Sequence, residues 1–358
     1  MSLMRPTADA GGGDGSASRE DGAAGPAATA PARAARRGFT RAVAVLVLVT
    51  VAGLMSMLGP RAALDGTGEA AAPGAGGTAL LRTVLFAALC VPAGELFAAR
   101  LVRRLPGAPL STPRSWAPWA AAAGCVAALG LASVVATGNL VPADIADIDV
   151  GGLYETRDGR LALLEVDAFV AAGLCALSRR PATQVWPLAA IAVAEALRAH
   201  PPTEHSPLVG SGLTFLHVMC ASLWAGGLLY VLRTLHHWRG TRGEHPLEAS
   251  AALLGLYARV AAVPLAALTA TGLCSTLRRM PPETVLEQLT TTAYGRALLA
   301  KVLLVVVVAA LALVARVRLS RASDPLTACS PARAEVVVLG LVVAVSAVLT
   351  TLPVPIRW

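Results

Sequence analysis

The sequence predicts an all-α protein, a polytopic bundle of about nine transmembrane helices, and three observations support this fold class. Hydrophobic residues make up 55% of the 358 residues, whereas charged residues make up only 15%. A soluble globular protein carries about 25% charged residues, so this chain has too little charge to cover a surface that faces water. The apolar residues fall in blocks of about 20, the length that a helix needs to cross about 30 Å of hydrocarbon. Arginines gather in alternate gaps between these blocks, as in multi-pass membrane proteins.

Nine apolar blocks are expected to form the membrane helices. They cover about residues 39–59, 79–102, 117–140, 161–178, 183–199, 208–232, 255–277, 294–316 and 334–352. The fourth and fifth blocks are short and contain acidic residues, so they fit a membrane span least well.

The segment before the first block has a different composition. Residues 1–38 are rich in Gly, Ala, Pro and Ser and have almost no large apolar side chain. Such a segment cannot offset the entropy lost on ordering, so we expect a disordered cytosolic tail. The expected organisation is this tail, a five-helix membrane half over 39–199 and a four-helix membrane domain over 200–358.

The charges in the gaps predict the orientation. Arg36 and Arg37 precede the first block, whereas the gap between the third and fourth blocks is acidic, with Asp144, Asp147 and Asp149. The positive-inside rule then places the N-terminus in the cytosol and Trp358 outside. We attribute the net charge of +8 to this topology and to anionic lipid headgroups, so the expected partner is the lipid bilayer and no nucleic acid.

A histidine inside the sixth block is the first candidate site residue. His217 lies roughly 13 Å below the outer boundary of that block, at 1.5 Å per residue. An ionisable side chain at such a depth is costly and therefore indicates a functional site, although a packed interhelical histidine is the alternative. His200 and His205 lie in the Pro-rich turn before this block, where they are either metal ligands or surface-loop residues.

A thiol accompanies this histidine on the same helix face. Cys220 stands three residues after His217, and positions i and i+3 of a helix are neighbours. Imidazole binds Cu(II) and many divalent ions, whereas thiolate selects Cu(I). We therefore expect a metal site formed by His200, His205, His217 and Cys220, whose ligand types suit Cu(I), Cu(II) and other divalent ions.

Three carboxylates are expected in the outer half of the membrane. Glu165 and Asp167 fall in the first turns of the fourth block, and Glu195 falls near the outer end of the fifth. Together they predict an acidic mouth that attracts cations toward His217, although each could instead extend to the interface.

The segment from about Ala199 to Pro355 resembles the CopD family of copper-resistance and copper-uptake proteins. The resemblance is carried, in order, by the His200 turn, LHVMCASLWAGGLL, YARVAAVPLAALTATG, TAYGRALLAKVLL and a closing helix with TLPVP. It implies copper transport or copper homeostasis at the plasma membrane, with a metal-handling role for His200 and His217 only. Some members carry an external copper-binding domain that this sequence lacks, so copper would come from a separate external carrier protein or from solution.

These observations predict copper transport across the plasma membrane, in the import direction. One alternative is a haem-binding, cytochrome-like redox subunit, which is disfavoured because only His217 lies deep enough to ligate a haem. Another is a non-transporting copper sensor or assembly partner. No nucleophile elbow, P-loop, dinucleotide fingerprint or metalloprotease motif is found, so we do not expect an enzyme.

Overall fold

The computed structural model describes residues 29–109, 111–138, 144, 150–204, 206–239, 246–280, 282–321 and 329–354, and no strand occurs among them. The helices are α1 (Thr29–Leu64), α2 (Ala75–Val102), α3 (Ala117–Thr137), α4 (Val150–Glu155), α5 (Arg157–Leu177), α6 (Val185–Ala199), α7 (Pro207–Trp238), α8 (Pro246–Arg279), α9 (Val285–Thr291), α10 (Ala293–Arg321) and α11 (Cys329–Leu349), with a 3₁₀ turn at Pro181–Gln184. The predicted all-α class is confirmed.

Each of the nine expected blocks coincides with one of the longer helices, but not all of these helices are suited to cross a membrane. Within the described ranges, seven helices are long and apolar enough, namely α1, α2, α3, α7, α8, α10 and α11. Helix α6 has 15 residues and so reaches only about 22 Å, short of the roughly 30 Å of hydrocarbon. Helix α5 carries five charged residues within its sequence RDGRLALLEVD. Seven of the expected membrane spans are therefore supported.

Helix α1 begins ten residues earlier than the boundary expected at residue 39. Its first residues, TAPARAARRG, are rich in Ala and Arg, which favour helix. Pro31 lies in the first turn, where proline is tolerated. Residues 1–28 of the expected tail lie outside the described part. The chain divides into two compact units, 1–46 and 47–358, and the second contains the candidate site.

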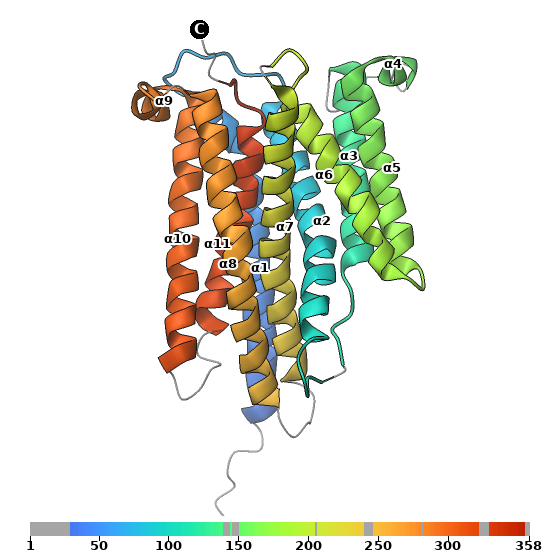
Figure 1. Ribbon diagram of the computed structural model, residues 1–358, viewed down its shortest axis with the longest axis vertical. Coiled ribbons are helices and arrows are strands. Elements are labelled where there is room, and N and C mark those ends of the chain that lie inside the picture. Colours follow the sequence, from blue (N-terminus) through green and yellow to red (C-terminus); the bar gives the residue numbers. More distant parts are fainter. Residues whose placement is uncertain are drawn as a thin grey trace, which may run out of the picture. The chain divides into compact units, whose positions relative to one another are not determined.

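Within the second unit the helices form two neighbouring groups (Figure 1). Helices α3, α5 and α6 pack side by side, and α3 also packs against α2. Helix α7 packs against α8, while α10 packs against α11. Helix α2 connects the groups because it contacts α3 on one side and α7 and α11 on the other.

Glycines allow α2 and α7 to approach closely. A Cβ atom at Gly94 of α2 would lie 2.0 Å from the carbonyl carbon of Gly226 on α7. A Cβ atom at Gly226 would lie 1.8 Å from the carbonyl oxygen of Cys90. Small residues allow such backbone contact between membrane helices. The Gly226–Gly227 pair thus serves helix packing.

A polar contact fixes the start of α3 against α2 and α7. The carboxylate of Glu95 accepts a hydrogen bond from the backbone N–H of Trp116 at 2.9 Å and pairs with Arg233 at 2.6 Å. The Arg233 guanidinium lies 3.6 Å from the ring centre of Trp116. Glu95 therefore has a local basic partner and a structural role.

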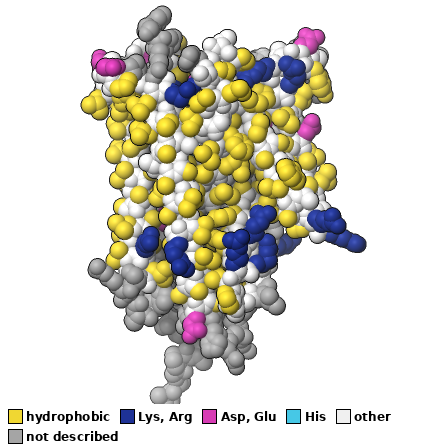
Figure 2. Space-filling model, viewed as in Figure 1, with side chains coloured by type: hydrophobic (Ala, Val, Ile, Leu, Met, Phe, Trp, Pro, Cys, Tyr) yellow, Lys and Arg dark blue, Asp and Glu magenta, His cyan; other side chains and the backbone are white. Residues whose placement is uncertain are grey.

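The surface of the second unit is apolar along the helices. Large side chains such as Trp119 and Val126 are 72% and 68% exposed. Figure 2 shows hydrophobic side chains over the middle of the molecule, with Lys and Arg gathered mainly toward the end where α7 finishes. An exposed apolar surface of this extent fits contact with lipid. The chain is thus a multi-pass membrane protein.

Candidate metal site

His217 lies at the interface between α7 and α8. It follows the first residue of α7 by ten positions, about 15 Å along the helix. Its Nδ1 is 2.9 Å from Oγ1 of Thr271 on α8. A Cβ atom added at Gly272 would lie 3.7 Å from the imidazole ring. The imidazole therefore points at the neighbouring helix.

The hydrogen bonds of Thr271 determine which nitrogen of His217 carries the hydrogen. The Thr271 hydroxyl donates to the backbone carbonyl of Ala267 at 2.7 Å. A hydroxyl has a single hydrogen, so its oxygen is left to accept from Nδ1–H of His217. The neutral imidazole then carries its lone pair on Nε2, for which no partner is found among the described residues. A metal-binding histidine is typically held in this way, by a hydrogen bond from its other ring nitrogen.

A positive charge lies close to this nitrogen donor. Lys301 on α10 acts electrostatically on His217, and Arg279 acts on Lys301. The Arg279 guanidinium also donates to the Tyr294 hydroxyl at 3.1 Å. A cation at His217 would be repelled by Lys301, which weakens its binding. Weak binding suits a site from which an ion must leave again.

His200 differs from His217 in its hydrogen bonding. Its side chain is buried, with Nδ1 2.6 Å from the Glu204 carboxylate and Nε2 2.9 Å from Oγ1 of Thr214 on α7. Gly210 lies against the ring, since a Cβ atom there would come within 2.4 Å of Nδ1. Both ring nitrogens are therefore engaged, and a metal could bind only by displacing Glu204 or Thr214.

The structure does not bring the three described members of the expected site, His200, His217 and Cys220, into one cluster. Among the described residues, no group of three or more His, Cys, Asp or Glu side chains is placed to hold a metal ion. Cys220 is buried as a free thiol on α7. His205 lies outside the described residues. The four-residue metal site stays a prediction, and His217 is the member with an available nitrogen.

Two of the expected carboxylates meet in the interior, where they pair with arginines. Glu165 on α5 lies 3.0 Å from Arg198 on α6, which is also 3.4 Å from Glu195. Glu195 in turn lies 3.0 Å from Arg82 on α2. Two carboxylates and two guanidinium groups carry no net charge when all are ionised. The network therefore connects α2, α5 and α6 but does not present free negative charge to a cation.

Asp167 lies away from this network. It is exposed on α5, whereas Glu165, two residues earlier, is fully buried. Positions i and i+2 of a helix point in different directions, which explains the separation. The three carboxylates thus do not form one mouth in the structure.

The sequence interpretation missed the partners of these groups. Arg82 and Arg198 lie within apolar blocks, and Arg198 follows Glu195 at the i+3 spacing of a helical ion pair. That spacing is a signal that could have been used. The pairings of Glu165 with Arg198 and of His217 with Thr271 join different helices, and no local pattern indicates them.

Part of the helical bundle matches a known protein family. The family model described as CopD, copper resistance protein D, matches residues 251–349. We refer to the residues that match this family model as the CopD domain. No curated protein and no solved structure gives a significant match.

The CopD domain covers only part of the segment for which the resemblance was expected. It includes most of α8, all of α10 and α11, and therefore Thr271 and Lys301. His200 and His217 precede it. The interface between α7 and the CopD domain is where His217 meets Thr271.

Proposed function

We propose that this protein transports copper across the plasma membrane, in the import direction, with His217 as the central copper-binding residue. The observation that carries the proposal is the imidazole of His217, which is oriented by Thr271 of the CopD domain and keeps Nε2 available. The description of the matching family, copper resistance protein D, supports copper as the ion. A single nitrogen donor near Lys301 favours a monovalent ion, so we propose Cu(I).

The proposed route follows the contact between α7 and α8. With the N-terminus in the cytosol, the start of α7 lies at the outer face, and copper arrives there from solution or from an external carrier. It passes His200 and Glu204 at this end and then reaches His217, about 15 Å along α7. The buried pairs of Glu165 and Glu195 stabilise the bundle in this scheme.

Measurement of cellular copper tests the proposal. Four strains are grown with added copper, and their copper content is measured by mass spectrometry. One strain lacks the protein, and the others carry wild type, His217→Ala or His236→Ala. His236 is exposed at the other end of α7 and serves as the matched control. We expect cell copper to fall to the level of the deletion strain with His217→Ala and to stay at wild type with His236→Ala. Equal copper in wild type and His217→Ala would refute import through His217.

Purified protein separates this function from the two alternatives. A haem-binding subunit would show a Soret absorption band, and a sensor or assembly partner would bind copper without moving it into proteoliposomes. Both ring nitrogens of His200 are engaged, so this histidine offers no open axial ligand, which favours transport over haem binding.

A further inference from the structure

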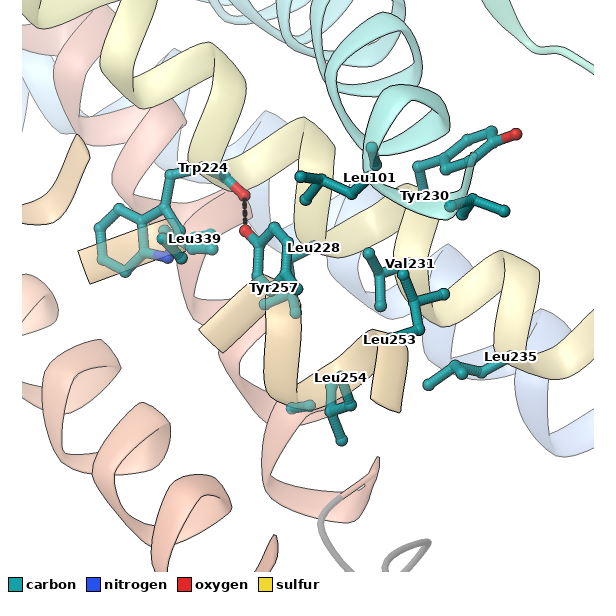
Figure 3. Packing of buried hydrophobic residues seen from close by; sticks show 14 of the residues in the cluster. Leu101, Trp224, Leu228, Tyr230, Val231, Leu235, Leu253, Leu254, Tyr257 and Leu339 are labelled. Carbon is teal, nitrogen blue, oxygen red and sulfur yellow. Dashed lines mark hydrogen bonds between the residues drawn. The ribbon is translucent and has the colours of Figure 1, made fainter. Parts of the chain in front are cut away.

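A second ionisable side chain lies inside the bundle, within the CopD domain. Glu335 on α11 is 4% exposed. Ala332 and Leu339, on the same face of this helix, belong to the buried cluster that also contains Trp224 and Tyr257. Figure 3 shows Trp224 of α7, Tyr257 of α8 and Leu339 of α11 together, with the Tyr257 hydroxyl donating to the Trp224 carbonyl at 2.6 Å. Glu335 therefore enters an apolar and aromatic core.

The groups around Glu335 include one donor and one other titratable side chain. The indole N–H of Trp224 lies near the carboxyl group and favours its charged form. Tyr257 is close enough for the charge of Glu335 to act on its hydroxyl. Arg316 on α10 and Arg333 on α11 are exposed.

Glu335 differs in this respect from the other buried acids of the described chain. Glu95, Glu165 and Glu195 each have an arginine within 3.0 Å. No ion pair of Glu335 with a Lys or Arg is found within the described ranges. An isolated carboxylate in an apolar interior is costly, and the group avoids this cost by binding a proton. The indole N–H of Trp224 can donate to a carboxyl oxygen in either protonation state.

Glu335 lies near a residue on the same face of α7 as His217. Trp224 follows His217 by seven residues, so it lies about two turns, or roughly 10 Å, further along the same face of α7. Both residues contact α8, His217 through Thr271 and Trp224 through Tyr257. Glu335 acts on the Trp224–Tyr257 contact, which lies about two turns further along α7 than His217.

We propose that Glu335 is a proton-binding site of the CopD domain, and that its proton leaves when a cation arrives from His217. The second half of this proposal rests on the proposed copper transport. The exchange is balanced in charge: the O–H bond of the carboxylic acid breaks, the proton leaves to water, and the carboxylate faces the incoming Cu(I). No oxidation or reduction takes place. The cation can then cross the apolar core without adding a net charge to it.

Infrared spectroscopy tests proton binding without any need for copper. Full-length protein in liposomes is compared at neutral pH as wild type, Glu335→Gln and Glu95→Gln, the last as a control because Glu95 is paired with Arg233. We expect a protonated-carboxyl C=O band in wild type and in Glu95→Gln, and loss of that intensity in Glu335→Gln. If Glu335→Gln does not fold, Glu335→Asp is used, and the band is expected to shift in frequency. A spectrum that is the same with and without the substitution would overturn the proposal.

Proton release is tested with copper in the same liposomes. An internal pH dye and copper uptake are recorded together, and wild type is expected to release about one proton for each Cu(I) that enters the site. In Glu335→Gln this release should be lost. Copper uptake with no proton release in wild type would overturn the exchange while leaving copper transport intact. Absence of uptake in wild type would instead refute the proposed function, and the infrared result would still decide whether Glu335 binds a proton.

Discussion

At the scale of single residues, the hydrogen-bonding state of a side chain decides whether it is available to a metal. His200 and His217 are both expected ligands, yet His200 is engaged at both ring nitrogens and His217 at only one. Thr271 determines which nitrogen of His217 stays available, because its hydroxyl hydrogen is donated to the Ala267 carbonyl. Thr271 therefore acts as a positioning residue that fixes the tautomer of His217.

Removal of the Thr271 hydroxyl should weaken copper binding. We expect Thr271→Val to lower Cu(I) affinity by roughly 10–100-fold, the usual cost of losing the group that orients a ligand. Thr271→Ser keeps the hydroxyl and should restore most of the affinity. Competition with a Cu(I) chelator measures the change in purified protein.

The control for this experiment lies on the same helix. Thr269 is exposed and its hydroxyl donates to the Leu265 carbonyl. Thr269→Val should leave the affinity unchanged. Equal loss of affinity in Thr271→Val and Thr271→Ser would contradict the assigned role of the hydroxyl.

At the scale of helices, small residues determine which helices can touch. Gly94 and Gly226 bring the backbones of α2 and α7 into contact, and this contact holds the two groups of helices of the second unit together. Ion pairs add a second set of constraints, because Arg198 joins α6 to α5 and Arg82 joins α2 to α6.

Enlargement of the glycine at this contact should destabilise the protein. In Gly226→Ala, the new Cβ atom would come within 1.8 Å of the Cys90 carbonyl oxygen, so the helices must separate. We expect a loss of about 1–3 kcal/mol or more in the free energy of unfolding, as for other overpacked sites. Thermal or denaturant unfolding in detergent measures it. Gly212→Ala, on the same helix with nothing within 4 Å, is the control and should unfold as wild type does.

At the scale of the whole molecule, the two helices that are not supported as membrane spans leave the sidedness of the chain ends unchanged. Helices α5 and α6 follow one another and pack together. If both cross the membrane there are nine spans, and if neither crosses there are the seven supported by length and composition. Both numbers are odd, so the two ends of the chain are expected on opposite sides in either case.

Cysteine labelling at three exposed positions tests this topology. In a chain without its native cysteines, we expect Asp65→Cys to react with an impermeant maleimide from outside and Arg104→Cys to react only after the cells are opened. These positions lie at opposite ends of α2. Reaction of Arg104→Cys in intact cells would show the inverted orientation.

The third position, Arg180→Cys, distinguishes nine spans from seven. It lies in the connection between α5 and α6. Reaction only from the cytosolic side shows that both helices cross the membrane. Protection from the reagent on both sides would show that this connection stays within the membrane.

The sequence by itself determined the helical class, the approximate positions of the membrane helices and the resemblance of the C-terminal part of the chain to the CopD family. These features depend on composition, on apolar block length and on motifs, all of which are local in the chain. The tertiary structure alone decided that Glu165 and Glu195 are neutralised by Arg198 and Arg82, that Thr271 orients His217, and that Glu335 has no basic partner among the described residues. Each of these depends on side chains that meet across different helices, and the rotation of one helix against another is set by packing that no single segment encodes.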